Sequence, residues 1–220
     1  MSDIPYKLVR SRRKTLALTI DSSAQLVVRS PMRLSEDIIR EFIRKKAHWI
    51  AAKQRQINDF ASKQSPLVLA DGENIMYCGN SYAVSRGGVS EVVVEDRFIK
   101  IPESMTIKDF ANWLRKQCKI IVCQRLNYYA NFMGEKYVSV RFSGARSRWG
   151  SCGARNTLNF AWRLVMCPQF VIDYVIVHEL SHIAHKDHSA RFWGRVSTVM
   201  PDYKQAQDWL RLNRRLMDII

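Results

Sequence analysis

The sequence predicts an α+β fold in which a small β-rich lobe with one helix precedes a domain of helices and a small antiparallel sheet. Three observations favour this class. Before Pro102, short apolar runs alternate with turn residues, which is typical of strands. After Thr106, apolar residues recur mostly at helical spacing. A long apolar run then ends in two histidines, which predicts a buried helix that carries chemistry. We therefore expect two domains, residues 1–103 and 104–220.

Short strands and one helix are expected in the first lobe. Residues 6–30 alternate apolar and polar side chains around Asp21-Ser22-Ser23, which predicts a β-hairpin. A helix is expected over residues 35–60, where apolar residues have helical spacing. Residues 65–102 contain several glycine turns, and we expect a second hairpin around Glu95-Asp96-Arg97. No pattern in this lobe indicates a catalytic or metal-binding site.

The second domain opens with a long amphipathic helix. Thr106 and Asp109 form a capping-box pattern at its start, and Gly134 is a typical C-terminal cap. Strands are expected at residues 138–142 and 158–164, with turns and a further strand between them. One more helix is expected after Ser189, and a last one over residues 203–217.

A helix near residue 175 carries the clearest chemical signal. Pro168 suits a first helical turn, and residues 171–177 are apolar on nearly every face, as in a buried helix. His178 and His182 then stand about 6 Å apart along the axis on one face, where both imidazoles can bind one metal ion. Glu179 is rotated by about 100° from His178, which places its carboxylate beside the metal. This H-E-x-x-H pattern is typical of zinc hydrolases.

A catalytic zinc site usually has three protein ligands, and two histidines are candidates for the third. His185 lies on the same helical stripe but about 10 Å along the axis from His178, which is too far for easy convergence. His188 follows Lys186-Asp187, where the helix can end and the chain can turn back toward the metal. We therefore favour His188 as the third ligand and assign His185 a supporting or solvent-facing position.

Several other motifs accompany the histidines along the second half of the chain. They are Ser147-Arg-Trp-Gly-Ser-Cys152, Leu158-Asn159, Trp162-Arg-Leu164, Pro168, Val171-Ile-Asp-Tyr-Val175, His178-Glu-Leu-Ser-His182, His188-Ser189, Phe192-Trp193 and Pro201-Asp-Tyr203. With this set the chain resembles the YgjP-like metallopeptidases, a prokaryotic family related to the SprT-like and WLM zincins. The resemblance extends from about Lys14 to about Leu216.

The resemblance implies a zincin-like metallopeptidase domain with one Zn²⁺ per chain. It implies His178, His182 and His188 as metal ligands and Glu179 as the catalytic residue. Zinc would lower the pKa of a bound water toward about 7, and Glu179 would take the proton and deliver it to the leaving amine. A peptide or protein is the expected substrate. The long helix after Thr106 is expected to pack behind the metal helix.

The strands before the metal helix are expected to form the wall of the active-site cleft, and an extended peptide could add to the edge of that sheet. The candidate substrate-binding residues are Arg148, Trp149, Asn159 and Arg163. Either arginine could stabilise an oxyanion. The alternative is structural: Trp149 packs in the core, Gly150 permits a β-bulge, and Arg148 pairs with a carboxylate such as Asp173.

The net charge of +15 gives a second functional clue. Such a charge attracts nucleic acids, nucleotides and acidic surfaces when the basic groups share a face. It keeps two alternatives to a peptidase open, a metal-dependent nucleotide phosphohydrolase of the nucleoside triphosphate pyrophosphatase type and a nucleic-acid-associated module with a structural metal. A basic surface that is merely solvated explains the charge equally well.

Composition indicates a globular, cytoplasmic protein. The chain has 220 residues and 47% hydrophobic content, enough for a substantial core. Its five cysteines form no C-x-x-C pair, so reduced, buried thiols are expected, and Cys152 has no evident activating base. The sequence shows no targeting segment and no apolar run near the roughly 20 residues that span a bilayer, so no membrane partner is expected.

Overall fold

The computed structural model describes residues 4–21, 24–61 and 67–219, with only the backbone for residues 56–61. In these ranges it has the predicted α+β character, with helices and three small sheets. Within the same ranges, no helix combines the length with the apolar character that a membrane-spanning segment needs.

The chain divides into two compact units, Met1–Pro66 and Leu67–Ile220. The sequence predicts this boundary between residues 103 and 104. In the structure the boundary lies earlier, between Pro66 and Leu67, because the segment after Leu67 shares a core with the second half of the chain. Ile75 and Ile99, for example, belong to the same buried cluster as Val177.

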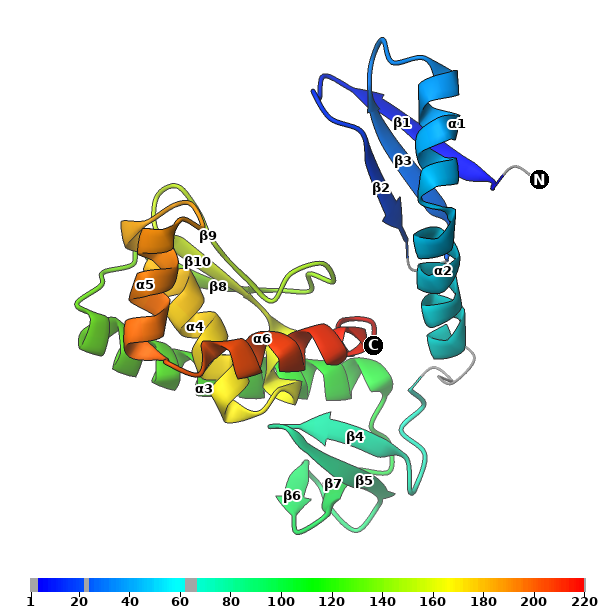
Figure 1. Cartoon of the computed structure of the whole chain (residues 1–220). Coiled ribbons are helices and arrows are strands. Elements are labelled where there is room, and N and C mark those ends of the chain that lie inside the picture. The colour runs from blue at the N-terminus through cyan, green and yellow to red at the C-terminus, as the bar shows by residue number, and fades with distance from the viewer. Residues whose placement is uncertain (1–3, 22–23, 62–66, 220) are drawn as a thin grey trace. The chain divides into compact units, whose positions relative to one another are not determined.

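The first unit contains a three-stranded mixed sheet, drawn in blue in Figure 1. Its central strand is β3 (Leu26–Pro31), with β1 (Tyr6–Ser11) parallel on one side and β2 (Ala17–Ile20) antiparallel on the other. The predicted hairpin therefore corresponds to β2 and β3, and β1 adds a third strand. Ser22 and Ser23 of the predicted turn lie outside the described residues.

Among the described residues of the first unit there are two helices where the sequence predicts one. α1 (Glu36–Lys45) and α2 (Ala47–Ala61) are separated at Lys46. Buried side chains of the helices and the sheet form a core that belongs to this unit. The buried members of this core are Leu26, Val28, Ile39, Ile43 and Ile50.

The second unit begins with a four-stranded sheet in the order β4-β5-β7-β6. Its strands are β4 (Asn74–Tyr77), β5 (Asn80–Arg86), β6 (Val93–Glu95) and β7 (Phe98–Ile101). β6 and β7 form the predicted antiparallel hairpin. In the β4–β5 turn, the backbone N–H of Cys78 donates to the carbonyl oxygen of Val165 at 2.8 Å. This bond joins the sheet to the segment just before the histidine-bearing helix.

The long helix α3 (Ile107–Met133) follows this sheet. Its predicted capping box is present, because the Asp109 backbone N–H donates to Thr106 Oγ1 and the Thr106 backbone N–H donates to Asp109 Oδ2, each at 3.2 Å. Gly134 ends the helix in the left-handed conformation, with φ at 67°. α3 packs against the histidine-bearing helix, as expected from the family resemblance.

The third sheet is mixed, not antiparallel as predicted. It contains β8 (Ser139–Ser143), β9 (Gly150–Cys152) and β10 (Thr157–Ala161) in the order β8-β10-β9. β9 pairs antiparallel with β10, and the chain reverses direction twice between β8 and β10, so β8 and β10 run parallel. After Ala161 the expected strand turns into a 3₁₀ helix, η1 (Trp162–Met166).

Helices form the rest of the second unit. They are α4 (Gln169–Ala184), α5 (Ala190–Val199), α6 (Tyr203–Leu212) and the 3₁₀ helix η2 (Arg214–Met217). The last predicted helix is thus interrupted at Asn213. α4 packs against α3, α5, α6 and strand β9, and all residues from Val171 to Val177 are buried. Figure 1 shows α4 in gold among these helices. Burial of the stretch from Val171 to Val177 explains why every residue in it except Asp173 is apolar or aromatic.

Candidate metal centre and active site

Three histidine side chains converge at the C-terminal end of α4. The ligand nitrogens of His178, His182 and His188 all lie within 4.8 Å of one another. Nε2 of His178 and Nε2 of His188 are 3.2 Å apart. Two nitrogens that each bind a tetrahedral metal at about 2.0–2.1 Å lie about 3.3 Å apart, so this pair has the spacing of two ligands of one ion. The donor set and its geometry therefore fit a divalent metal.

Hydrogen bonds on the Nδ1 atoms orient the two histidines of α4. His178 Nδ1 lies 3.3 Å from Tyr174 Oη, which accepts a hydrogen bond from Gln207 Nε2 at 3.1 Å. His182 Nδ1 lies 2.9 Å from the carbonyl oxygen of His185. Because a carbonyl only accepts, His182 Nδ1 carries the proton and Nε2 keeps its lone pair for a metal. Bonds of this kind fix the tautomer and ring orientation of metal ligands.

Two aromatic residues of α5 pack on the histidine cluster. The Phe192 ring centroid lies 4.9, 4.4 and 4.8 Å from those of His178, His182 and His188. Trp193 stacks on His188 at 5.8 Å and on Tyr203 at 5.2 Å. Phe192 is fully buried, so the side of the cluster that its ring covers is closed to solvent.

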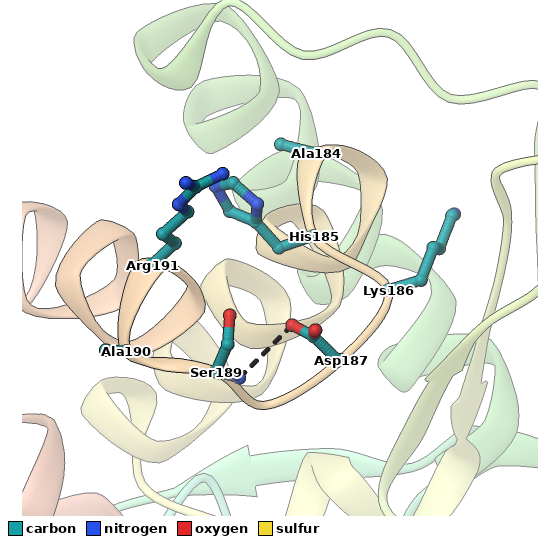
Figure 2. Close-up of a pocket in the computed structure, with 7 residues that line it drawn as sticks. All are labelled: Ala184, His185, Lys186, Asp187, Ser189, Ala190 and Arg191. Atoms are coloured by element: carbon teal, nitrogen blue, oxygen red, sulfur yellow. Dashed lines mark hydrogen bonds between the residues drawn. The ribbon is translucent and has the colours of Figure 1, made fainter.

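The third histidine lies in the turn between α4 and α5, which is attached to the third sheet. Lys186 Nζ donates to Asn156 Oδ1 at 2.7 Å, to the Gly153 carbonyl oxygen at 3.2 Å and to Cys152 Sγ at 3.4 Å. At the start of α5, the Ser189 backbone N–H donates to Asp187 Oδ1 at 3.2 Å. Figure 2 shows this turn and an open pocket on it, which His185 and Arg191 also line.

Glu179 is buried between α4 and β9, next to the histidine cluster. Its side chain lies against the main chain of Gly150. Its Oε2 atom has no hydrogen-bond partner among the described residues. Burial raises the pKa of Glu179 to about 8, and the positive charge of Arg148 opposes this shift. Burial also lowers the pKa of His178 to about 3, with smaller contributions from His182 and His188. His178 is therefore neutral near pH 7, as a metal ligand must be.

The family described as YgjP-like, metallopeptidase domain, matches residues 14–213 of the chain. The chain belongs to this family. It is therefore a metallopeptidase, and the family implies a divalent metal and peptide or protein substrates. This result confirms the resemblance inferred from the sequence motifs. Within the described residues, the three-histidine cluster is the group of side chains able to hold that metal.

Similarity to solved structures is weaker. The crystal structure of the metallopeptidase zymogen of Pyrococcus abyssi abylysin has 20% sequence identity to the YgjP-like chain. The match covers 42% of this chain and 93% of the abylysin chain, with a TM-score of 0.39. Likeness at this level carries no argument about the site. No curated protein sequence matches the chain.

The predicted substrate-binding arginines have different surroundings in the YgjP-like domain. Arg148 is exposed, and its charge acts on Glu179. Arg163 is buried: its guanidinium donates to the carbonyl oxygens of Ile219 at 2.9 Å and Gly144 at 3.3 Å, and it stacks on Trp162 at 4.4 Å. Burial lowers its pKa to about 10. This placement supports a structural role for Arg163, not contact with substrate.

The other two predicted substrate-binding residues also make structural contacts. Trp149 is half-buried and packs against the main core, and its carbonyl oxygen accepts from the Ala161 backbone N–H at 2.8 Å. Asn159 is on the central strand β10, where its Nδ2 donates to Ser143 Oγ at 3.0 Å. Neither contact involves the histidine cluster.

Two of the structural alternatives are corrected. Asp173 forms an ion pair with Arg125 of α3, at 2.6 and 2.7 Å, and not with Arg148. Gly150 does not form a bulge, since Gly150, Ser151 and Cys152 pair one to one with β10. As expected, Cys152 is not activated: burial raises the pKa of its thiol, and the nearby Lys186 only partly opposes this.

Some residues of the site were not identified from the sequence. Tyr174 precedes His178 by four residues, so helical spacing alone could have placed it beside that ring. Lys186 and Gly150 gave no such signal, because their partners Asn156 and Glu179 are about 30 residues away in the sequence.

Proposed function

We propose that this YgjP-like chain is a zinc-dependent peptidase in which His178, His182 and His188 hold one Zn²⁺ and Glu179 is the general base. The observation that carries the proposal is the convergence of three imidazole nitrogens within 4.8 Å beside a buried carboxylate. Zinc is the favoured metal because imidazole ligands and a tetrahedral spacing suit it.

A bound zinc ion supplies Lewis acidity, which polarises a carbonyl and makes a water easier to deprotonate. The chain's own contribution is the transfer of a proton by Glu179. Glu179 accepts it from the attacking water at a carboxylate oxygen and then donates it to the nitrogen of the leaving amine. Its burial keeps competing water away from that carboxylate. Arg148 is the candidate to bind the substrate near this step, because it is exposed and its charge reaches Glu179.

The metal site is tested by the metal content of purified protein, measured by elemental analysis. We expect about one zinc per chain in the wild type. His188→Ala should lose or loosen the metal. His185→Ala is the matched control and should keep the metal. It removes a histidine of the same turn, but the group that contacts His182 is the main-chain carbonyl oxygen of residue 185, which alanine retains. A wild type that binds no zinc even when zinc is added would overturn the proposal.

The reaction is tested with a panel of peptides beside a panel of nucleoside triphosphates. We expect the wild type to cleave peptide bonds, and Glu179→Gln to slow this by about 10²–10⁴-fold while retaining the metal. Release of pyrophosphate without peptide cleavage would instead favour the nucleotide phosphohydrolase. Full peptidase activity of metal-loaded Glu179→Gln would remove Glu179 from the mechanism.

A further inference from the structure

Strand β9 comes unusually close to Glu179 at Gly150. A Cβ atom placed on Gly150 would lie 2.6 Å from Glu179 Oε1, 2.7 Å from Cγ and 2.9 Å from Cδ. Carbon atoms of side chains essentially never approach this closely. Any side chain at position 150 and the observed side chain of Glu179 therefore exclude each other.

Glycine is not required here for its backbone freedom. Gly150 does not have a positive φ angle, unlike Gly134, for example, where left-handed geometry ends α3. It lies in a regular strand, paired with Phe160 of β10. An alanine would adopt this backbone conformation without strain. The space next to Glu179 is therefore the structural reason for a glycine at this position.

Neither partner can move away easily. Glu179 is only 5% exposed, and the crowding would involve its Cγ and Cδ as well as the end of the side chain. On the other side, β9 is held by pairing with β10. Just beyond it, Lys186 binds the Gly153 carbonyl oxygen. A side chain at position 150 would have to displace the carboxylate, the strand or both.

We propose that Gly150 is a positioning residue for Glu179. The absence of a side chain leaves the space in which the Glu179 carboxylate stands beside the histidine cluster. This inference rests on the proposed role of Glu179 as general base. It predicts that Gly150→Ala lowers kcat and leaves KM and the metal content close to those of the wild type, because the three atoms nearest to the added methyl group all belong to Glu179 and none to a histidine.

The activity test compares Gly150→Ala with Gly144→Ala. A Cβ atom on Gly144 would lie 3.9 Å from Trp162 Nε1, an ordinary contact, and Gly144 is exposed. We expect Gly150→Ala to lose roughly 10²-fold in kcat, the size of effect that a misplacement of about 1 Å can have. Gly144→Ala should keep the wild-type kcat. Wild-type kcat in metal-loaded Gly150→Ala would overturn the inference.

A second comparison isolates the contact with Glu179. In the Glu179→Gln background, Gly150→Ala should add little further loss of kcat, because the group it displaces no longer accepts a proton. An undiminished loss in that background would show that Gly150 acts elsewhere. If Glu179→Gln itself is fully active, the proposed role of Glu179 as general base is wrong. That outcome would leave the close approach of Gly150 to Glu179 unchallenged.

The third comparison needs no activity and also covers a variant that folds poorly. Thermal unfolding of metal-free protein is followed for Gly150→Ala in the wild-type and the Glu179→Ala backgrounds. We expect Gly150→Ala to lower the melting temperature in the wild-type background and to have little effect in the Glu179→Ala background, where the crowding is relieved. Equal destabilisation in both backgrounds would contradict the inference.

Discussion

Two parts of the candidate metal site are built in different ways. α4 supplies His178, His182 and Glu179 from one buried helix, so their relative positions follow from helical geometry. His188 comes from an exposed turn, and its approach to His178 depends on how that turn is held in place. The buried part is held by core packing along α4, whereas the turn is held by the polar bonds of Lys186 and by the rings of Phe192 and Trp193 against His188. The two parts should therefore respond differently to mutation.

The largest difference is expected when one ligand is removed from each part. His188→Ala leaves two histidines at fixed spacing on α4, whereas His182→Ala leaves one on α4 and one on the turn. Both should weaken zinc binding by more than the roughly 10–100-fold that supporting residues contribute, and His182→Ala should be the weaker binder. Zinc titration against a competing chelator measures this. Equal affinities would mean that the turn is as rigid as the helix.

The next effect concerns the attachment of α4 to α3. Asp173→Ala removes the carboxylate that Arg125 binds through two nitrogens, and the Asp173 side chain is 8% exposed. We expect a loss of about 2 kcal/mol in the free energy of unfolding, because the half-buried guanidinium of Arg125 loses its charged partner. Denaturant unfolding measures the loss.

The control for this prediction is Asp208→Ala, which breaks the exposed pair with Arg211. That variant should lose less than about 1 kcal/mol. If the two variants are equally stable, the ion pair does not anchor α4. Apolar packing alone would then hold the helix more firmly than the turn.

A smaller effect is expected at the turn itself. Lys186→Ala removes the bonds to the β9–β10 hairpin and should weaken zinc binding by about tenfold, with little change in stability. Lys116→Ala, at an exposed position of α3, should bind zinc like the wild type. In the His188→Ala background, Lys186→Ala should have no further effect. A further loss there would show that Lys186 acts on α4 and not through the turn.

The smallest effect is expected within α4, where packing already holds the rings. Tyr174→Phe keeps the aromatic ring and removes the oxygen between Gln207 and His178 Nδ1. Zinc affinity should fall by about tenfold or less, and the change should be smaller than for Lys186→Ala. Tyr203→Phe, which keeps the ring that stacks on Tyr174 and Trp193, is the control. A larger effect of Tyr174→Phe than of Lys186→Ala would reverse the ranking of the two parts.

Local patterns in the sequence determine much of this protein. The capping box of Thr106 and Asp109 and the cap at Gly134 set the limits of α3, because capping involves neighbours in the chain. The apolar run before His178 and the four-residue spacing to His182 predict a buried helix with both imidazoles on one face. Helical geometry alone brings these two rings together, so they could be predicted without the fold.

Tertiary structure decides the features that depend on segments far apart in the sequence. The central position of β10 makes the third sheet mixed, and a shared core moves the boundary between units to Leu67. Arg125, not Arg148, pairs with Asp173. The approach of Gly150 to Glu179 also has no local signature. Such contacts depend on how whole elements pack against one another. The residues they join are far apart in the sequence, and no regular spacing between them predicts the contact.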